Sequence, residues 1–303
     1  MSKRIFRSAA HQELFDRQGF IVLPFVNAAE VAQLNSLFDT LHPDIGQSGF
    51  FSGSYSADFE YKKKASDEIV KVFSRAYEDL FIDYTPFGGA FLYKVPGANS
   101  ALAAHQDWTI VDEQEHVALN CWVPLQDITA DNGPIMILPG SQYDNFNVVR
   151  APTLPFFFSG NEDVIHPELI PMIVPAGTAV ILNQSVIHYS PDNKSAEVRR
   201  AITAGVKSAG ARMKFHYRVP GRDALEVFDM EDDFLISFRD FARDIGQRPY
   251  LGTYQGEIPY TMPQPDRERL RQMISDMKTR AGYSMSQPPR SMMQRVRSWL
   301  SRV

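Results

Sequence analysis

The sequence predicts a mainly β protein, a sandwich or a barrel, with helices on both sides of the β region. Short runs with β character alternate with Pro- and Gly-containing turns from Ala90 to about Val206, which is typical of these folds. Apolar residues recur at helical spacing before this region, and polar helical patterns follow it. With 303 residues, 44% of them apolar, the chain is long enough to bury one large core.

The region before the strands is predicted to be largely helical. Ser8 can cap a first helix and Asn27 a second, and the apolar run 20–26 between them predicts a strand. Residues 47–60 are rich in Gly, Ser and aromatic side chains and predict a loop. A third helix is expected over 66–80.

The β region contains six predicted strands and one long insert. The predicted strands are 91–95, 117–124, 135–138, 172–174, 178–182 and 200–206. The insert, 142–170, is rich in Phe, Pro and Asn, and a loop of this length in a compact domain is usually functional or disordered. Its apolar run 153–158 is open to two interpretations, inward packing and a lid that excludes water.

Beyond the β region the sequence predicts a helical C-terminal extension. Helical patterns cover 223–245 and 266–278. We therefore expect a domain over 1–220, including the N-terminal helices, and an extension over 221–303 that packs on it. The basic amphipathic tail, 288–303, would contact a membrane surface, an acidic partner, a second subunit or its own domain.

Composition excludes several classes of protein. The chain has 31 Lys and Arg against 36 Asp and Glu, and this net charge of −5 argues against nucleic acid as a partner. A single cysteine, Cys121, excludes a disulfide framework and fits a reducing compartment. No apolar run is long enough for a transmembrane segment, and the first residues lack the apolar stretch of a secretion signal. We therefore expect a cytoplasmic protein.

The most informative short motif is the sequence His105-Gln106-Asp107. In an extended segment, residues two apart project to the same side, so the imidazole and the carboxylate can share a metal ion. Similar His/acid pairs occur at 11/13, 42/44 and 166/168, so this motif alone is weak evidence. Residues on later strands must therefore show whether His105 and Asp107 belong to a metal site.

Two later residues supply that context. His188 follows a strand-like run and adds a second imidazole; two His and one carboxylate typify non-haem Fe(II) oxygenases, although His ligands also suit zinc. Arg199 stands at the start of the next strand-like run, where a planar guanidinium can hold a small dicarboxylate by two parallel hydrogen bonds. Its neighbour Arg200 would face the other side of the strand, so only one of the two can point inward.

Several ordered pieces of sequence surround these residues. They are 93–96, 105–107, 121–125, 131–134, 137–141, and 188–190 followed by Arg199. In this order they resemble the phytanoyl-CoA dioxygenase family of Fe(II)- and 2-oxoglutarate-dependent oxygenases. The resemblance fades after about Val206.

The resemblance implies a fold, a site and a reaction. The fold is a double-stranded β-helix (a jelly-roll, cupin-like core) with flanking helices. The implied site residues are His105, Asp107 and His188 for iron, Arg199 and Ser190 for the distal carboxylate of 2-oxoglutarate, and Trp122 and Lys94 for the walls of the cosubstrate pocket. The reaction uses O2 and couples oxidative decarboxylation of 2-oxoglutarate to succinate with C–H oxidation of a small molecule. Because Asp107 is intact, hydroxylation is favoured over halogenation.

Two alternative functions remain open at this point. The first is a cupin-like metalloenzyme that does not use 2-oxoglutarate, against which Arg199 argues because such an enzyme needs no carboxylate clamp. The second is a non-catalytic jelly-roll binding module. The intact His and Asp set argues against it, because polar groups gathered in a dry pocket are costly without a metal.

The substrate itself is less legible. Five basic or potentially basic residues gather without an acid: Lys207, Arg212, Lys214, His216 and Arg218. One interpretation is a solvated strand pair or loop, and the other is a binding surface near the mouth of the site. With the Phe-rich insert, this cluster favours a small-molecule substrate that is anionic or acyl-bearing.

Overall fold

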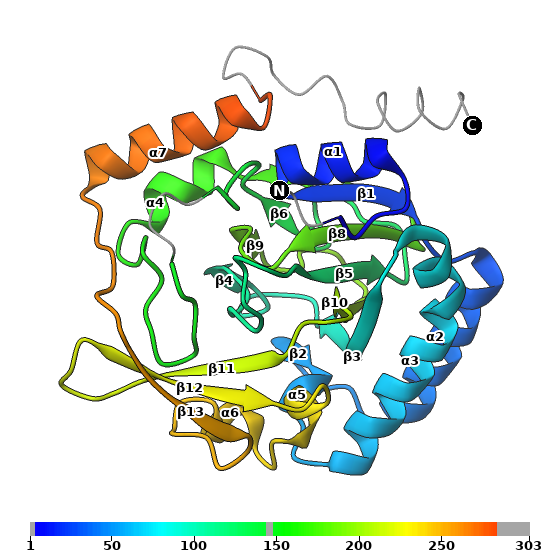
Figure 1. The fold of residues 1–303 in the computed structure, drawn as a ribbon. Helices are drawn as coiled ribbons and strands as arrows, with labels where there is room; N and C mark the ends of the chain where they lie inside the picture. Colours follow the sequence, from blue (N-terminus) through cyan, green and yellow to red (C-terminus); the bar gives the residue numbers. More distant parts are fainter. Residues whose placement is uncertain (1–3, 144–147, 284–303) are drawn as a thin grey trace.

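The computed structural model describes residues 4–143 and 148–283, with two antiparallel sheets at its centre (Figure 1). The larger sheet has the strand order β1-β8-β5-β10-β3-β2 and the smaller one the order β4-β9-β6-β7. The larger sheet comprises β1 (Phe20–Pro24), β2 (Phe50–Ser52), β3 (Tyr84–Lys94), β5 (Ala118–Pro124), β8 (Thr178–Asn183) and β10 (Arg199–Ser208). The smaller comprises β4 (Leu102–His105), β6 (Met136–Ile137), β7 (Ile170–Pro171) and β9 (His188–Ser190). This pair of facing sheets confirms the predicted jelly roll.

The N-terminal helices agree with the sequence pattern, with one shift. They are α1 (Ala9–Gln18), α2 (Ala28–Leu41) and α3 (Phe59–Leu80). Ser8 and Asn27 cap the first two as predicted, and Asn27 does so in a reciprocal capping box with Glu30. The third helix begins before the predicted residue 66, because the Asp58 carboxylate accepts the Tyr61 amide and caps an earlier turn. The predicted loop 47–60 also holds β2 and a 3-10 turn, η1 (Gly53–Tyr55).

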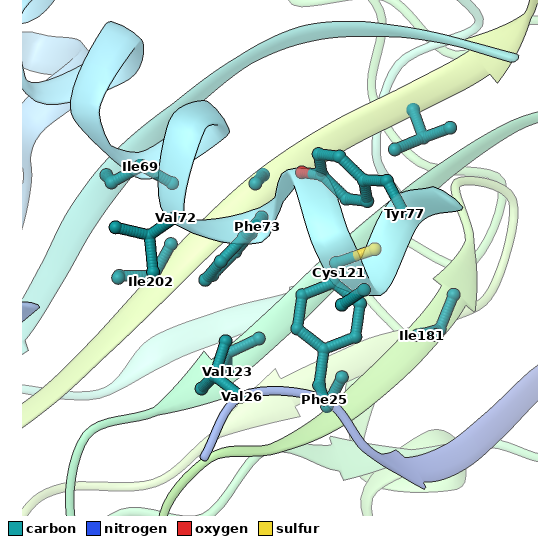
Figure 2. Packing of buried hydrophobic residues seen from close by; sticks show 14 of the residues in the cluster. Phe25, Val26, Ile69, Val72, Phe73, Tyr77, Cys121, Val123, Ile181 and Ile202 are labelled. Atoms are coloured by element: carbon teal, nitrogen blue, oxygen red, sulfur yellow. The ribbon is translucent and has the colours of Figure 1, made fainter. Parts of the chain in front are cut away.

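Side chains of the central strand β5 alternate between the two faces of the larger sheet. Leu119, Cys121 and Val123 are completely buried in the core that α2 and α3 cover. Figure 2 shows this core, with Cys121 beside Tyr77 of α3. Trp122 points to the opposite face, into the core between the two sheets. Cys121 therefore faces away from Trp122, and burial raises the pKa of its thiol.

The C-terminal part contains a third sheet, with the order β11-β12-β13. Its elements are β11 (Met213–Arg218), β12 (Ala224–Met230) and β13 (Thr253–Pro259), with the short helices α5 (Phe234–Ser237) and α6 (Phe241–Asp244). The prediction of a helix over 223–245 is therefore wrong at its start, where the chain forms β12 between two partner strands. The predicted helix over 266–278 is present as α7 (Arg267–Arg280).

Both C-terminal units share buried clusters with the jelly roll. Met213 and Phe228 of the third sheet pack with Phe87 of β3. The helix α7 packs against Ile187, next to β9, and against α4 (Glu162–Ile165). A 3-10 turn, η2 (His166–Glu168), follows α4 directly. The predicted boundary at residue 220 falls between β11 and β12, which pair with each other. The division into 1–220 and 221–303 stays a prediction.

Two expectations from the sequence concern the amphipathic tail and membrane-spanning helices. The amphipathic tail predicted over 288–303 lies outside the described residues, as do residues 144–147 of the insert. Among the helices of residues 4–143 and 148–283, none combines the length and the apolarity that crossing a bilayer requires.

Candidate active site

The structure brings His105, Asp107 and His188 together, from one loop and two paired strands. His105 ends β4 and is the register partner of His188 in β9, and Asp107 follows two residues after β4. The strands β4 and β9 lie close together in Figure 1. The Nε2 atoms of both imidazoles lie 3.9 Å from Asp107 Oδ1. One ligand atom from each residue lies within 4.8 Å of the others, which is the geometry of a site for a single metal ion.

Both imidazoles are oriented by backbone carbonyl groups. His105 Nδ1 lies 2.7 Å from the Ala103 carbonyl oxygen, and His188 Nδ1 lies 2.9 Å from that of Val186. A carbonyl oxygen can only accept, so each Nδ1 donates. Nε2 is therefore the ring atom left to bind a metal ion, and in both rings it lies near Asp107. Sequence alone could not name these two carbonyl groups.

Burial keeps the His105 imidazole neutral. Desolvation lowers the pKa of His105, and the nearby His188 lowers it further, against the opposing effects of Asp107 and the Ala103 carbonyl group. The ring centroids of the two histidines lie 4.0 Å apart. A neutral imidazole is the form that binds a metal ion.

Asn120 holds the carboxylate and was not foreseen from the sequence. Its Nδ2 donates to Asp107 Oδ2 at 3.2 Å, and its Oδ1 accepts from Thr203 Oγ1 at 2.6 Å. It stands on β5 two residues before Trp122, so both side chains face the interior of the jelly roll. The alternation of side chains along β5 could have predicted that Asn120 faces inward. The sequence does not show that Asn120 lies beside Asp107.

Arg199, and not Arg200, points inward. Arg199 is 1% exposed, and its Nε and Nη1 atoms have no hydrogen-bond partner among the described residues. Burial lowers its pKa to about 9, so the guanidinium is still positive at neutral pH. Arg200 lies on the other face of β10, where it pairs with Asp39 at 2.9 Å and stacks over Phe38. An unpaired buried cation of this kind fits a ligand carboxylate.

A cavity of about 190 Å³, the arginine cavity, connects Arg199 with the triad of His105, Asp107 and His188. Trp122 and Ser190 also line it, and the guanidinium carbon of Arg199 lies 5.6 Å from the centre of the Trp122 ring. Ser190 Oγ donates to the Gly133 carbonyl oxygen, which leaves its lone pairs for another donor. The predicted neighbours Arg199, Trp122 and Ser190 are thus in one place.

Lys94 is buried behind this wall rather than on it. Its Nζ donates to the carbonyl oxygens of Ser190 and Pro191. Burial, and then the charge of Arg199, lower the pKa of Lys94 to about 7, while Asp192 acts in the opposite direction. Its role as a residue lining the cosubstrate pocket stays a prediction, because the cavity wall described here does not include it.

A second cavity of about 250 Å³, the apolar cavity, also reaches the triad. His105 and Asp107 belong to both cavities. Phe156, from the Phe-rich run of the insert, lines the apolar cavity, while Phe157 and Phe158 are buried beneath α7. The run 153–158 therefore packs inward, as one of its two interpretations expected, while its role as a lid stays a prediction.

The predicted basic cluster does not gather at either cavity. Lys207 is buried and bound to the Ala211 carbonyl oxygen and to Asp232, and Lys214 pairs with Asp229. His216 is buried with Nδ1 near the Thr109 carbonyl oxygen. The walls of the two cavities at the triad contain none of these three side chains.

Comparison with known proteins agrees with this geometry. The family model of phytanoyl-CoA dioxygenase (PhyH) matches residues 15–201, more than half of the chain. The chain therefore belongs to the phytanoyl-CoA dioxygenase family. The resemblance expected from the sequence is confirmed, and the match contains all seven predicted site residues.

Individual relatives match over a shorter stretch. Phytanoyl-CoA dioxygenase domain-containing protein 1 of Danio rerio is 31% identical over 120 residues, which are 37% of this chain and 41% of that protein. Phytanoyl-CoA dioxygenase 1 of Oryza sativa subsp. japonica is 26% identical over 118 residues, 38% of this chain and 42% of that protein. The matched stretch thus spans about two fifths of these curated relatives.

Solved structures confirm the fold. The α-ketoglutarate-dependent carbocyclase SnoK from nogalamycin biosynthesis superposes with a TM-score of 0.51 at 16% identity, over 68% of this chain and 86% of that one. The epimerase SnoN, in complex with Fe3+, α-ketoglutarate and nogalamycin RO, gives 0.51 at 18% identity, over 86% and 97%. At these identities the likeness shows the shared jelly roll.

Proposed function

We propose that the protein is an Fe(II)- and 2-oxoglutarate-dependent dioxygenase that hydroxylates a small molecule. The observation that carries the proposal is the pairing of a two-His, one-carboxylate triad with a buried guanidinium that lacks a protein partner, across one cavity. The donor set suits Fe(II) with open coordination positions, and the unpaired Arg199 suits a dicarboxylate. The residues present therefore fit both Fe(II) and 2-oxoglutarate.

Three side chains would hold the iron. His105 and His188 would bind through Nε2, because their Nδ1 atoms are committed to carbonyl groups. Asp107 would bind through Oδ1, while Asn120 holds Oδ2. When bound, Fe(II) couples the O2-dependent decarboxylation of 2-oxoglutarate to succinate with oxidation of a substrate C–H bond.

Arg199 would orient the cosubstrate. Its Nε and Nη1 have no partner among the described residues and can donate charge-assisted hydrogen bonds to the distal carboxylate, and Ser190 lies on the same wall. Trp122 covers one side of the guanidinium and excludes water from it. Fixing the distal end in this way places the keto-acid end of the molecule toward the triad.

The two alternatives are less well supported. A cupin-like metalloenzyme that does not use 2-oxoglutarate would leave Arg199 buried and unpaired, which is costly. A non-catalytic binding module has no need for two imidazoles with oriented Nε2 atoms. A cytoplasmic location and a small-molecule substrate remain parts of this proposal, with Cys121 as the support for a reducing compartment.

Anaerobic titration with Fe(II) and then 2-oxoglutarate tests the proposal. We expect a weak visible charge-transfer band that needs both additions. Arg199→Ala should weaken 2-oxoglutarate binding about 100-fold, because two charge-assisted hydrogen bonds are lost. The same variant should keep its affinity for Fe(II).

Arg200→Ala is the matched control, because Arg200 is the adjacent guanidinium on the opposite face of β10. It should bind both Fe(II) and 2-oxoglutarate as the wild type does. Unchanged 2-oxoglutarate binding in Arg199→Ala, or no band in a wild-type protein that retains zinc, would contradict the proposal.

A further inference from the structure

The apolar cavity bears on which substrate the proposed dioxygenase accepts. It reaches the triad at His105 and Asp107, and Arg199 is not among its lining residues. The large apolar side chains on its wall are Phe87, Trp108, Ile110, Phe156, Leu235 and Ile236. Backbone of three glycines, Gly88, Gly89 and Gly205, forms part of the wall as well. A wall of this composition favours a flat or bulky apolar ligand.

Charge is almost absent from this wall. Among the described residues that line the cavity there is no Lys, Arg or Glu, and its one carboxylate, Asp107, belongs to the triad. An anionic group entering here would find no Lys or Arg side chain on the wall to pair with. The basic residues that favoured an anionic substrate are elsewhere, with Lys207 bound to Asp232 and Lys214 to Asp229.

Two buried glutamines belong to the polar part of the wall, which also contains Ser52, Ser54, Tyr55, Asn120 and Thr203. Gln106 and Gln184 both line it and are 1% and 5% exposed. Gln106 Nε2 donates to the Ser185 carbonyl oxygen, which fixes the amide so that Oε1 is the remaining atom. Oε1 of Gln106 and Oε1 of Gln184 have no hydrogen-bond partner among the described residues. Buried acceptors without a donor are costly, so both atoms fit a ligand that donates.

One wall comes from outside the family match. Leu235 and Ile236 lie on α5, whereas the family model ends at residue 201. The helix is anchored by Phe234 and Phe238, which are buried with the third sheet. Lys62 of α3 also donates to the Phe238 carbonyl oxygen and fixes this segment from the other side. The wall that α5 provides thus belongs to this chain's own C-terminal part and is held by buried contacts.

We propose that the apolar cavity binds an uncharged substrate with an apolar body and a hydroxyl or amide N–H donor, which Gln106 and Gln184 accept. Leu235 and Ile236 determine specificity by excluding charged groups. The inference rests on the proposed function, since it places this substrate beside the metal triad. The anionic or acyl-bearing substrate that the sequence favoured is the alternative against which the following experiment tests it.

Binding of matched naphthalene probes to the anaerobic Fe(II)·2-oxoglutarate complex tests the inference by calorimetry. The probes are 2-naphthylmethanol, its methyl ether, 2-naphthalenesulfonate and decanoyl-CoA. We expect 2-naphthylmethanol to bind about tenfold tighter than the ether, which cannot donate a hydrogen bond. It should also bind at least tenfold tighter than the sulfonate and the thioester. Equal binding of alcohol and ether, tighter binding of either anion, or no binding of the neutral probes would overturn the inference.

Two variants assign the effect to named residues. Gln184→Met should remove most of the preference for the alcohol over the ether, while Gln272→Met, on the exposed face of α7, should leave it unchanged. Leu235→Arg should reverse the charge selectivity, with the sulfonate binding about tenfold tighter than it does to the wild type. If both Gln184→Met and Leu235→Arg keep the wild-type probe preferences, the assignment is wrong.

Failure of this inference can be told apart from failure of the proposed function. The charge-transfer band and the slow formation of succinate without substrate depend on the triad and Arg199 alone. A protein that shows both, but binds the anionic probes more tightly, would keep the proposed function and lose the substrate class. A protein that shows neither would lose the proposed function.

Discussion

The Asn120 amide links the metal triad to the central strands of the larger sheet. It donates to Asp107 and accepts from Thr203 of β10, so the carboxylate is held by a strand that is itself paired on both sides. Asp107 lies in a loop, and without this contact its carboxylate would rotate more freely. Outer partners of this kind typically change metal affinity 10–100-fold.

Asn120→Ala should therefore weaken Fe(II) or Co(II) binding by about tenfold or more, because Asp107 loses its orientation. Anaerobic metal titration followed by visible absorption measures this loss. Asn35→Ala is the control, since Asn35 is also half-buried and hydrogen-bonded but contacts α2 and the Leu125 carbonyl oxygen instead. Equal metal affinities for the Asn120 variant and the wild type would show that Asp107 is held by other means.

His216 should make stability depend on pH. Burial lowers its pKa to about 4, and Lys214 and Arg150 add to this effect, while the Thr109 carbonyl group and Asp112 act in the opposite direction. Between this value and the unfolded value of about 6.5, only the unfolded chain binds the proton. Acidification through this range therefore favours unfolding.

We expect His216 to contribute about 2 to 3 kcal/mol to the loss of unfolding free energy between pH 7 and pH 4.5. His216→Gln keeps a donor for the Thr109 carbonyl oxygen but does not titrate, so its stability should fall by that much less. Urea unfolding at several pH values measures the difference. Parallel stability curves for the two proteins would contradict the prediction.

The triad and the inward arginine were predicted from residue spacing together with the family resemblance. His105 and Asp107 share a face two residues apart, and strand alternation lets only one of Arg199 and Arg200 point inward, but the resemblance was needed to select Arg199. Asn120, Gln106 and Gln184 could not be predicted in the same way. Their roles depend on which strands pair and in which register, and a single sequence does not contain that information.

At the level of elements, α7 docks on the turn that precedes Ser141. Ser141 Oγ accepts the Ile187 amide, next to His188. In the same turn Gly140 has φ +79°, and a Cβ atom there would lie 2.1 Å from the Met277 carbonyl oxygen of α7. The turn thus needs glycine both for its backbone conformation and for the close approach of the helix.

Gly140→Ala should destabilise the protein more than Gly160→Ala, which isolates the backbone effect. Gly160 has φ +83° with open space around its Cβ position, so we expect a loss of about 1 kcal/mol there. Gly140→Ala should lose at least about 2 kcal/mol, because the clash with a backbone carbonyl adds to the strain. Thermal unfolding of both variants measures the difference, and equal losses would exclude the clash.

The strand β12 shows why part of the element pattern was misread. Its buried residues include Leu225, Val227, Phe228 and Met230, so the apolar positions do not alternate strictly and resemble a helical period. A register shift between Val227 and Phe228 in the pairing with β13 explains the break in alternation. Pairing with β11 and β13 on both sides outweighs the local pattern.

At the scale of the whole molecule, the C-terminal part and the jelly roll share their cores. Phe87 and Ile110 pack with Met213 and Phe228 in one buried cluster. We propose that the predicted parts 1–220 and 221–303 unfold together, since neither could leave without exposing this cluster.

Urea unfolding should therefore show one transition. Far-UV circular dichroism and thiol labelling of the buried Cys121 should give the same midpoint, because Cys121 lies in the jelly-roll core that α3 covers. Loss of ellipticity while Cys121 stays protected would indicate that the C-terminal part unfolds separately. Labelling of Cys121 in the folded protein, without urea, gives the baseline rate of thiol modification.

The strand β10 has a further consequence for how this protein could diversify. Ile202, Ala204 and Val206 face the helices, while Thr203 and Gly205 face the apolar cavity. A Cβ atom on Gly205 would lie 1.9 Å from the ring of Phe87, so even alanine there would displace that ring. Substitutions at Gly205 and Phe87 could thus change which ligand the apolar cavity accepts, with no change on the helix-facing side of β10.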